Sequence, residues 1–356
     1  MTAKPLGLGK TIGILGGGQL GRMLSVAASR LGYKTHVFEP GPNPPAADVA
    51  QRVTTADYGD TTALRAFAKA VDVVTYEFEN IPASALDLIE TDCPIHPTRE
   101  ALRISQDRLT EKTFLSSLGL GTAPFAAVST RQDLDRALTV ITPPAILKTR
   151  RLGYDGKGQA RINSVKDADS AFGAMAGAPA LLEGFVDFEL EISVIAARGI
   201  GGEIACFDPG ENLHLNGILH TTRVPARLGH ARLSDAVLIA ARILDALEYV
   251  GVLGVEIFVT ADGLIVNEIA PRVHNSGHWT QNGCVIDQFE QHIRAITGWP
   301  LGDGKRHSDV EMSNLIGDDI KQLSEHARAP GTALHIYGKA DAKPGRKMGH
   351  VNRILG

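Results

Sequence analysis

The first hundred residues alternate short apolar runs with segments of helical periodicity. Apolar runs at 11–15, 33–38 and 72–78 are typical of buried parallel strands. Helical patterns follow them, one ending at Arg30 with Gly32 as its C-terminal cap, and others near 61–70 and 82–91. This order predicts βαβ units with right-handed crossovers, and therefore a parallel α/β domain of about a hundred residues.

The pattern becomes shorter and more mixed after this domain. Asp107 is placed to cap a helix that runs to Leu118 and stops at Gly119. Between 122 and 182 we expect short strands and two short helices, including a strand at 145–148 that ends in Lys148 and another that begins at Ala160.

Period-two alternation returns in the second half of the chain. Strands are predicted at 180–183 and 189–197, and the second carries Glu189, Glu191 and Ser193 on one polar face. An amphipathic helix is predicted to begin at Ser234 and to end before Gly251, with an apolar face of Val237, Leu238, Ala241, Leu244 and Leu247.

Two apolar strands at 252–259 and 264–269 form a predicted hairpin whose register depends on its turn. A two-residue Asp262-Gly263 loop places Glu256 and Glu268 on opposite faces. A three-residue loop pairs Thr260 with Leu264 and sets the two carboxylates directly opposite each other, with Cβ atoms about 5 Å apart. Facing like charges require a proton or a cation between them, and the apolar neighbours offer few donors. We therefore expect Mg²⁺ at Glu256 and Glu268.

Composition restricts the class of protein. The chain of 356 residues exceeds a single compact core, and its net charge of −4 argues against a nucleic-acid-binding surface. Three distant cysteines predict neither a disulfide framework nor a zinc site, and no apolar run spans a membrane. We expect a reduced, soluble, cytoplasmic protein.

The first strand leads into a glycine turn, Gly16-x-Gly18-x-x-Gly21, with Glu39 after the next strand. This spacing matches the dinucleotide fingerprint, but glycine N–H groups at a helix N-terminus suit any phosphate. A phosphate or ribose ligand, a dinucleotide, and tight packing alone are the three interpretations that the turn leaves open.

A second glycine-rich segment, Gly153–Gln159, connects two predicted strands. Its three glycines predict a flap whose N–H groups and Lys157 close over phosphates, with an ordinary surface hairpin as the alternative. The segment 266–283 then combines a strand end with an arginine, two histidines, asparagines and a tryptophan, which indicates a binding surface. No helix aligns its two histidines as metal ligands.

A lysine, a glycine lid, a polar strand edge and paired carboxylates, without a P-loop, resemble the ATP-grasp superfamily. The motifs at 16–23, 153–159, 267–281 and 343–350 further resemble the 5-(carboxyamino)imidazole ribonucleotide synthetase family. The resemblance implies α/β and α+β architecture: an ATP-grasp fold with a Rossmann-like N-terminal domain (1–106), a lid (107–182), an ATP-grasp core (183–300) and a small β-rich C-terminal domain (301–356).

The resemblance also implies roles for individual residues. ATP is expected at Arg108, Lys148, Gly153, Tyr154, Asp155, Gly156, Lys157, Gly158, Gln159, Glu183, Gly184, Phe185, Val186, Glu191, His214, Asn267 and Glu268. The imidazole ribonucleotide is expected at Gly18, Gln19, Leu20, Glu77, Arg272, His274, Asn275, Ser276, Lys343, Arg346 and Lys347. Tyr154, Asp155, Lys157, Arg272 and Lys347 are the candidate catalytic residues.

The implied reaction is ATP-dependent carboxylation of 5-aminoimidazole ribonucleotide with bicarbonate, through carboxyphosphate, in purine biosynthesis. ATP is the co-substrate, Mg²⁺ the cofactor with Mn²⁺ as a substitute, and a homodimer the expected assembly. The alternatives are an ATP-grasp ligase with another acceptor, an NAD-dependent dehydrogenase and a non-catalytic nucleotide sensor. Lys157 stands where relatives often have arginine, and a smaller C-terminal cover is expected after His350.

Overall fold

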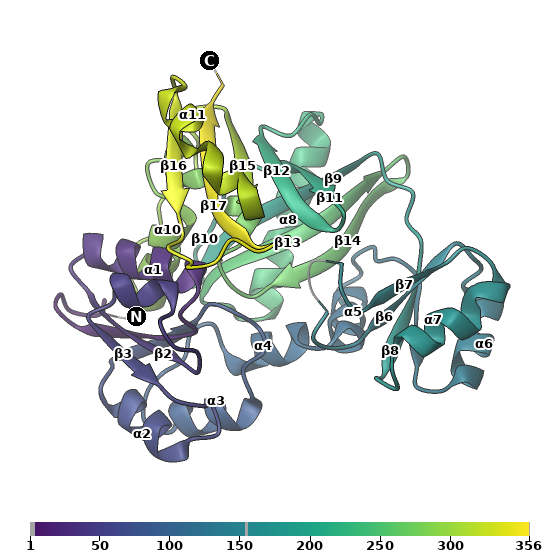
Figure 1. The fold of residues 1–356 in the computed structure, drawn as a ribbon, viewed down its shortest axis with the longest axis horizontal. Helices are drawn as coiled ribbons and strands as arrows, with labels where there is room; N and C mark the ends of the chain where they lie inside the picture. The colour runs from purple at the N-terminus through teal and green to yellow at the C-terminus, as the bar shows by residue number, and fades with distance from the viewer. Residues whose placement is uncertain (1–3, 154–155, 356) are drawn as a thin grey trace.

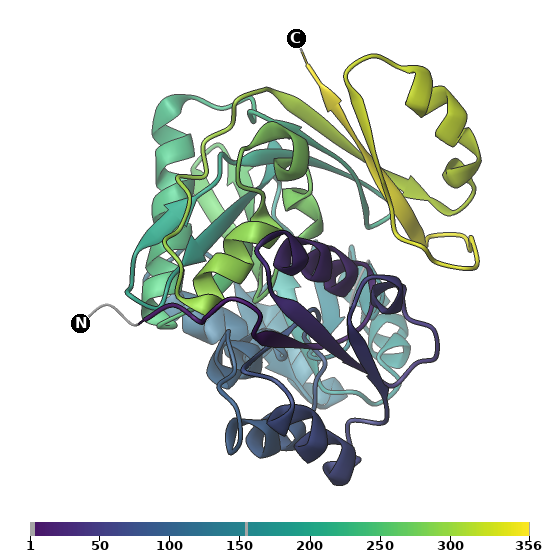
Figure 2. The same ribbon diagram turned by 90° about the vertical axis from the view of Figure 1, so that its left-hand side faces the viewer.

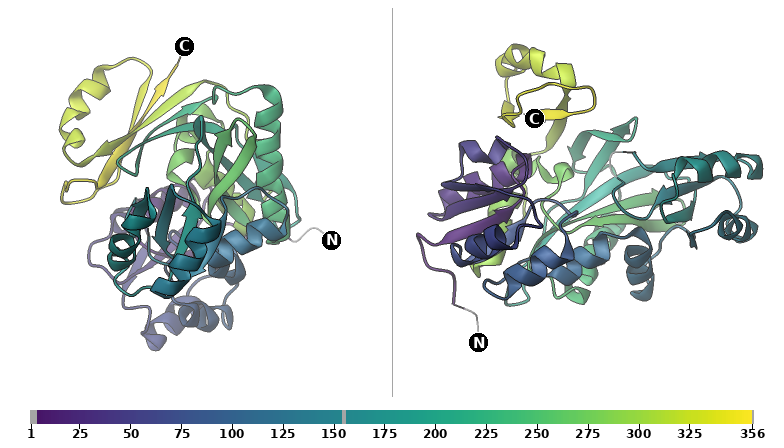
Figure 3. Two further views of the ribbon diagram at one scale, coloured as in Figure 1. Left: turned by 90° about the vertical axis from the view of Figure 1, so that its right-hand side faces the viewer. Right: turned by 60° about the horizontal axis from the view of Figure 1, so that its bottom comes forward.

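A computed structural model describes residues 4–153 and 156–355. It contains three sheets, and the small sheet of the lid extends away from the rest of the molecule (Figures 1 and 3). The predicted architecture is confirmed: a parallel α/β unit comes first, followed by antiparallel sheets. No helix in the described part of the chain is long and apolar enough to cross a membrane.

The N-terminal unit is a four-stranded parallel sheet in the order β3-β2-β1-β4. The strands are β1 (Thr11–Leu15), β2 (Lys34–Glu39), β3 (Arg52–Thr55) and β4 (Val73–Tyr76). The helices are α1 (Gln19–Arg30), η1 (Pro45–Asp48), α2 (Thr61–Lys69), α3 (Ala83–Glu90) and α4 (Arg99–Ser105). Each predicted strand and helix of this unit is present, with ends shifted by only a few residues.

The lid is a four-stranded antiparallel sheet in the order β5-β8-β6-β7. Its strands are β5 (Phe125–Val128), β6 (Ala145–Thr149), β7 (Gln159–Ile162) and β8 (Ala180–Gly184). Two helices, α6 (Arg131–Val140) and α7 (Ala168–Ala174), and the short η2 (Val165–Asp167) complete it. Strands β6 and β7 flank the glycine-rich segment, and β6 ends just after Lys148.

The largest sheet has nine strands in the order β14-β13-β9-β11-β12-β15-β17-β16, with β10 paired to β9. They are β9 (Leu190–Arg198), β10 (Ile204–Cys206), β11 (Gly210–Leu215), β12 (Ile218–Val224), β13 (Gly251–Thr260), β14 (Gly263–Ala270), β15 (Val310–Ile316), β16 (Thr332–Ile336) and β17 (Lys347–Ile354). The last three therefore extend the central sheet, and they stand above α1 in Figure 2.

Helices cover this sheet and connect it to the N-terminal unit. They are α5 (Arg108–Ser117), α8 (His230–Ala246), η3 (Asn275–Gly277), α9 (Thr280–Gly283), α10 (Gln288–Thr297), η4 (Gly317–Gln322) and α11 (Leu323–Arg328). One apolar core joins residues of α1, α10 and the central sheet, so the N-terminal unit and the sheet are packed as one body.

The start of α8 was wrongly predicted. The helix begins at His230 after the N-cap Gly229, and Ser234 lies exposed inside it. The face that packs on the sheet contains Ala236, Ala240 and Ile243, whereas Leu238 is 65% exposed. Leu244 and Leu247 of the predicted face are buried, so the error concerns the start of the helix and Leu238.

Candidate active site

The hairpin of β13 and β14 places Glu256 opposite Glu268, as predicted, but for a different reason. Thr260 pairs with Gly263 rather than with Leu264, so the connecting loop has two residues. The pairing then shifts by one residue. Ile257 pairs with Val266, but the next residue, Glu256, pairs with Glu268. Asn267 is the extra residue of this β-bulge. The bulge, and not a three-residue loop, brings the two carboxylates together.

The two facing carboxylates have opposite protonation tendencies. Burial, and then the charges of Glu268 and Glu191, raise the pKa of Glu256 well above its ordinary value. Burial acts in the same direction on Glu268, but the adjacent Arg108 guanidinium outweighs it and lowers the pKa of Glu268 to about 2. Arg108 Nη1 lies 2.9 Å from Glu268 Oε2. Glu256 is thus a buried carboxylate whose Oε1 lies 3.5 Å from His274 Nε2, and whose pKa the charges of Lys347 and Arg272 only partly lower.

Glu256 also belongs to a group of three potential metal ligands that does not include Glu268. Ligand atoms of Glu191, His214 and Glu256 lie within 4.8 Å of one another. Strands β9 and β11 bring the first two together, since Asn212 pairs with Glu191 and His214 Nδ1 lies 3.2 Å from Glu191 Oε2. This group joins Glu256 of the predicted metal pair to Glu191 and His214, two of the residues expected at ATP.

Two lysines of the predicted ATP region, Lys148 and Lys112, surround the carboxylate of Glu183. Its Oε2 accepts a hydrogen bond from Lys148 Nζ at 2.9 Å and lies 3.6 Å from Lys112 Nζ. Burial alone would raise the pKa of Glu183, but the two lysines lower it. Next to it, the amides of Gly184 and Phe185 donate to Pro124 and Pro144 carbonyls. In the described structure, Val186 is the first residue of this segment whose amide does not donate a hydrogen bond to a backbone carbonyl of the lid.

The flap follows directly from the strand that carries Lys148. Lys148 pairs with Gln159 across the β6–β7 hairpin, and the Gly158 carbonyl accepts a hydrogen bond from the Thr149 amide. Gly156 and Gly158 have φ values of 75° and 69°, which favour glycine at both positions. Gly153 and Lys157 belong to the same segment, and the predicted residues Tyr154 and Asp155 lie outside the described residues.

Carboxylates occupy the N–H groups of the first glycine turn. The Glu77 carboxylate accepts hydrogen bonds from the amides of Gly18 and Gly21, and Glu39 Oε2 accepts one from Gly17 at 2.7 Å. A Cβ atom at Gly16 would lie 2.5 Å from Glu77 Cγ. Tight packing, one of the three interpretations, is thus what the structure shows. A phosphate could use the Gly18 and Gly21 amides only by displacing Glu77, so that interpretation stays a prediction.

The first turn of α1 is otherwise close to the predicted arrangement. Gln19 begins the helix, but the Leu20 side chain is buried in the core, so only its backbone is available to a ligand. Burial raises the pKa of Glu77, and the Gly21 and Gly18 amides oppose that rise.

The loop after β14 orders its polar side chains through contacts within the protein. Arg272 Nη2 lies 2.5 Å from Glu79 Oε1, and His274 Nδ1 lies 2.8 Å from Ser276 Oγ. Asn275 exchanges two hydrogen bonds with Asn314 on β15. Of the four predicted substrate residues, Ser276 is completely buried and Asn275 fixes the loop to the sheet. Arg272 and His274 are the better candidates for ligand contact.

Electrostatics place the C-terminal segment near this loop. Burial, and then the charges of Arg272 and Lys347, lower the pKa of His274 to about 3. Lys347 also lowers the pKa of Glu256, so its ammonium group lies within range of both. Arg346 donates to the Asp341 carbonyl, and Lys343 is exposed. The second histidine, His278, is buried against His350, and its Nδ1 accepts a hydrogen bond from Gln288 Nε2 at 2.9 Å.

Two buried residues of α5 were missed. Glu111 and Lys112 are 2% and 1% exposed, and both contact β14. Their position one helical turn after Arg108 was a usable signal, because residues at i, i+3 and i+4 share a helix face. Glu79 and Asn314 were also missed, and no sequence pattern marks them.

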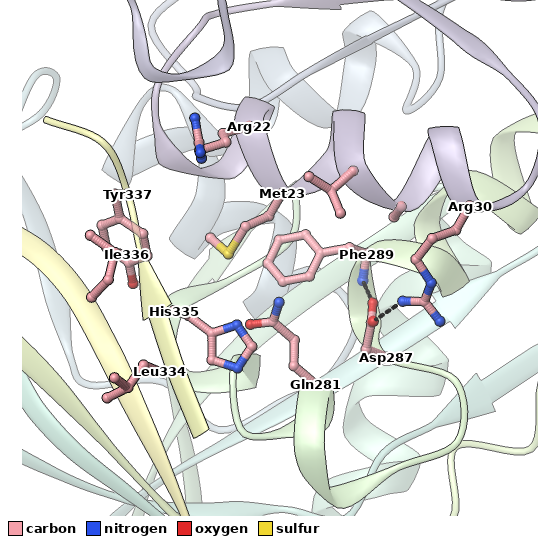
Figure 4. Close-up of a pocket in the computed structure, with 12 residues that line it drawn as sticks. Arg22, Met23, Arg30, Gln281, Asp287, Phe289, Leu334, His335, Ile336 and Tyr337 are labelled. Atoms are coloured by element: carbon pink, nitrogen blue, oxygen red, sulfur yellow. Dashed lines mark hydrogen bonds and ion pairs between the residues drawn. The ribbon is translucent and has the colours of Figure 1, made fainter. Parts of the chain in front are cut away.

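A separate cavity of about 250 Å³ lies between α1 and β16, with Met23, Phe289, Gln281 and Tyr337 among its lining residues (Figure 4). None of the predicted site residues lines it. Its two arginines are already paired, Arg22 with Asp48 and Arg30 with Asp287.

Comparison with known proteins agrees with this arrangement. Residues 9–106 match the ribonucleotide synthetase preATP-grasp domain, 113–289 the ATP-grasp domain, and 311–355 the phosphoribosylaminoimidazole carboxylase C-terminal domain. The N5-carboxyaminoimidazole ribonucleotide synthase of Brucella melitensis is 54% identical over 349 residues, which cover 97% of this chain and 96% of that protein. The chain belongs to the N5-carboxyaminoimidazole ribonucleotide synthase family.

Solved structures of this family share the fold. The ADP complex of one N5-carboxyaminoimidazole ribonucleotide synthetase has a TM-score of 0.96 and 44% identity, covering 99% of this chain and 94% of the other. The Aspergillus clavatus enzyme in complex with ADP and 5-aminoimidazole ribonucleotide has a TM-score of 0.92 and 31% identity, covering 98% and 94%. The predicted family is confirmed.

Proposed function

We propose that the protein carboxylates 5-aminoimidazole ribonucleotide with bicarbonate, at the expense of ATP, to the N-carboxyamino product, ADP and phosphate. The observation that carries this proposal is the similarity to N5-carboxyaminoimidazole ribonucleotide synthases over nearly the whole chain, including all three domains. The hairpin that pairs Glu256 with Glu268 supplies the site for a metal–nucleotide complex.

Glu256 and Glu268 are the residues proposed to hold Mg²⁺, with Mn²⁺ as a substitute. The buried Glu256 fits this role because burial and the charges of Glu268 and Glu191 raise its pKa, and a bound cation would offset both effects. When bound, the ion would neutralise charge on the transferring phosphoryl group. Glu191 and His214 lie close enough to Glu256 to border the same ion or the adjoining ribose.

The chain's own residues then have distinct tasks. Arg108 and Lys148 supply positive charge for the ATP phosphates, and 153–159 close over them. Glu183, Gly184, Phe185 and Val186 border the adenine, with Asn267 beside Glu268. Bicarbonate attacks the γ-phosphoryl group to form carboxyphosphate, and the substrate amine attacks that intermediate or the CO₂ released from it. Asp155 or the leaving phosphate accepts the amine proton.

The acceptor half of the proposed site is formed by the start of α1, the loop after β14 and the C-terminal segment. Arg272, His274 and Lys347 lie near Glu256, which connects this half to the nucleotide half. The phosphate group of the ribonucleotide is proposed to contact the backbone of Gln19 and Leu20 and the side chains of Arg346 and Lys343. Binding here requires the amides of Gly18 and Gly21 to exchange Glu77 for substrate, or Glu77 itself to contact the ribonucleotide.

The remaining expectations are part of the same proposal. The domain boundaries are proposed at 106/107, 182/183 and 300/301, although β8 (Ala180–Gly184) crosses the second of these. We also propose a cytoplasmic homodimer, a location supported by three free cysteines, Cys93, Cys206 and Cys284.

ADP release measured with and without each substrate tests the function. We expect release to require both 5-aminoimidazole ribonucleotide and bicarbonate, with the carbamate product trapped by ¹⁴C-bicarbonate. Release that needs bicarbonate and a different acceptor would instead identify another ATP-grasp ligase. Saturable NADH binding would favour the dehydrogenase alternative, which the bonding of Glu39 to the Gly17 amide already disfavours.

A further inference from the structure

The bulge at Asn267 determines whether Glu256 and Glu268 face each other. Starting from the Thr260–Gly263 pair, regular pairing would place Asn267 opposite Glu256 and turn Glu268 to the other face of the sheet. One inserted residue therefore decides the orientation of a proposed metal ligand. β14 is also the edge strand, and on its outer side a single backbone hydrogen bond from the Val266 amide to the Gly121 carbonyl lies beside the bulge.

Side chains of α5 bind the backbone on both sides of the bulge instead. Lys112 Nζ donates to the Asn267 carbonyl at 2.7 Å and lies 3.5 Å from the Val266 carbonyl. Glu111 Oε1 accepts the Ile269 amide at 2.7 Å. Arg108, one turn earlier on the same helix, binds Glu268 itself. Figure 1 shows α5 between this hairpin and the lid.

The burial of these two charges needs a reason. Lys112 is 1% exposed and Glu111 is 2% exposed, and each costs desolvation free energy that an apolar pair would avoid. Their short contacts are with backbone atoms next to the bulge, and the carboxylate nearest to Lys112 is Glu183 at 3.6 Å. The pair thus links the proposed adenine residue to the strand that carries the proposed metal ligand.

We propose that Glu111 and Lys112 are positioning residues that hold the β14 bulge and so keep Glu268 aligned with Glu256. This rests on the proposed function of Glu268 as a metal ligand. Glu111 acts through the hydrogen bond that its Oε1 accepts from the Ile269 amide, and not through its charge. A glutamine there retains an acceptor oxygen, whereas a methionine of similar length does not.

The test compares the wild-type enzyme with Lys112→Met, Glu111→Met and the matched control Glu111→Gln. Mg²⁺-dependent ADP release, the KM for 5-aminoimidazole ribonucleotide and amide hydrogen exchange in 263–270 are measured for each. In both methionine variants, we expect the Mg²⁺ concentration that gives half-maximal ADP release to rise by roughly tenfold or more. Loss of residues that orient metal ligands typically weakens metal binding by this factor. Exchange should rise in 263–270, the KM for the ribonucleotide should stay nearly unchanged, and Glu111→Gln should resemble the wild type.

Unchanged Mg²⁺ dependence and exchange in Lys112→Met would overturn the proposal. So would an equal rise in the KM values of all substrates, because that outcome means general loosening of the fold. If Lys112→Met does not fold, the two Glu111 variants carry the test. Mn²⁺ binding with ATP, followed by electron paramagnetic resonance, reports on the metal ligands without turnover. If the wild-type enzyme binds Mn²⁺·ATP but its ADP release does not depend on the ribonucleotide, the proposed function is contradicted. The positioning role of Glu111 and Lys112 is not contradicted by that result.

Discussion

Replacing Glu256 by Gln should stabilise the metal-free protein while abolishing turnover. Glu256 is buried and faces Glu268, and its pKa is raised well above the ordinary value by burial and by that neighbour. An acid whose pKa is raised on folding loses stability as the pH climbs above its unfolded value, because the unfolded state releases the proton first. The loss of folding free energy caused by Glu256 is therefore absent near pH 4 and largest above the pKa of Glu256 in the folded state.

The magnitude follows from the geometry of the pair. At a separation of about 5 Å and an effective dielectric constant of about 20, the repulsion is about 3 kcal/mol. Glu268 is 38% exposed and is neutralised by Arg108, so screening reduces this to about 1–2 kcal/mol. Glu256→Gln removes the repulsion at pH 8, which corresponds to a rise of a few degrees in melting temperature.

The assay is thermal unfolding in chelator-treated buffer from pH 4 to pH 9. Glu183→Gln is the control in which stability should change in the opposite direction. Lys148 and Lys112 lower the pKa of Glu183, and the substitution leaves buried Lys112 without a neighbouring carboxylate charge. The control should lose about 3 kcal/mol. A Glu256→Gln protein that is less stable than wild type at pH 8, or a difference that does not change with pH, would refute the reasoning.

Three further predictions concern the site and the fold. Glu268→Gln should reduce Mg·ATP turnover by at least about a hundredfold while circular dichroism remains native; near-normal activity would exclude Glu268 as a metal ligand. Gly21→Ala should cost about 1–3 kcal/mol and raise the KM for the ribonucleotide, because its Cβ would lie 2.7 Å from the Gly16 carbonyl oxygen; urea unfolding equal to wild type would contradict this. Burial lowers the pKa of His274 to about 3. The unfolded state alone takes up this proton below about pH 6.5, so stability should fall by up to about 1.4 kcal/mol per pH unit between pH 6.5 and 3. His274→Gln should reduce that slope in urea titrations at several pH values, and an unaltered slope would show that His274 is not responsible.

Much of this protein was determined by local sequence alone. Hydrophobic periodicity located three of the four strands of the N-terminal unit, all but β3, and both strands of the carboxylate hairpin, since side chains alternate with the period of the backbone. The motifs around Gly153 and Asn267 indicated the family, and the comparisons confirmed it. The facing of Glu256 and Glu268 was also predicted, although the loop invoked for it was wrong.

Only the tertiary structure decided how the site is held. Lys112 donates to the Asn267 carbonyl at the bulge from 155 residues away in the sequence, and the glycine turn is filled by Glu77, 59 residues from Gly18. Such contacts leave no periodic signal, because a helix face and a glycine turn are compatible with many partners. Local propensity specifies which backbone conformation a segment adopts, and packing between distant segments selects the side chain that completes each buried hydrogen bond.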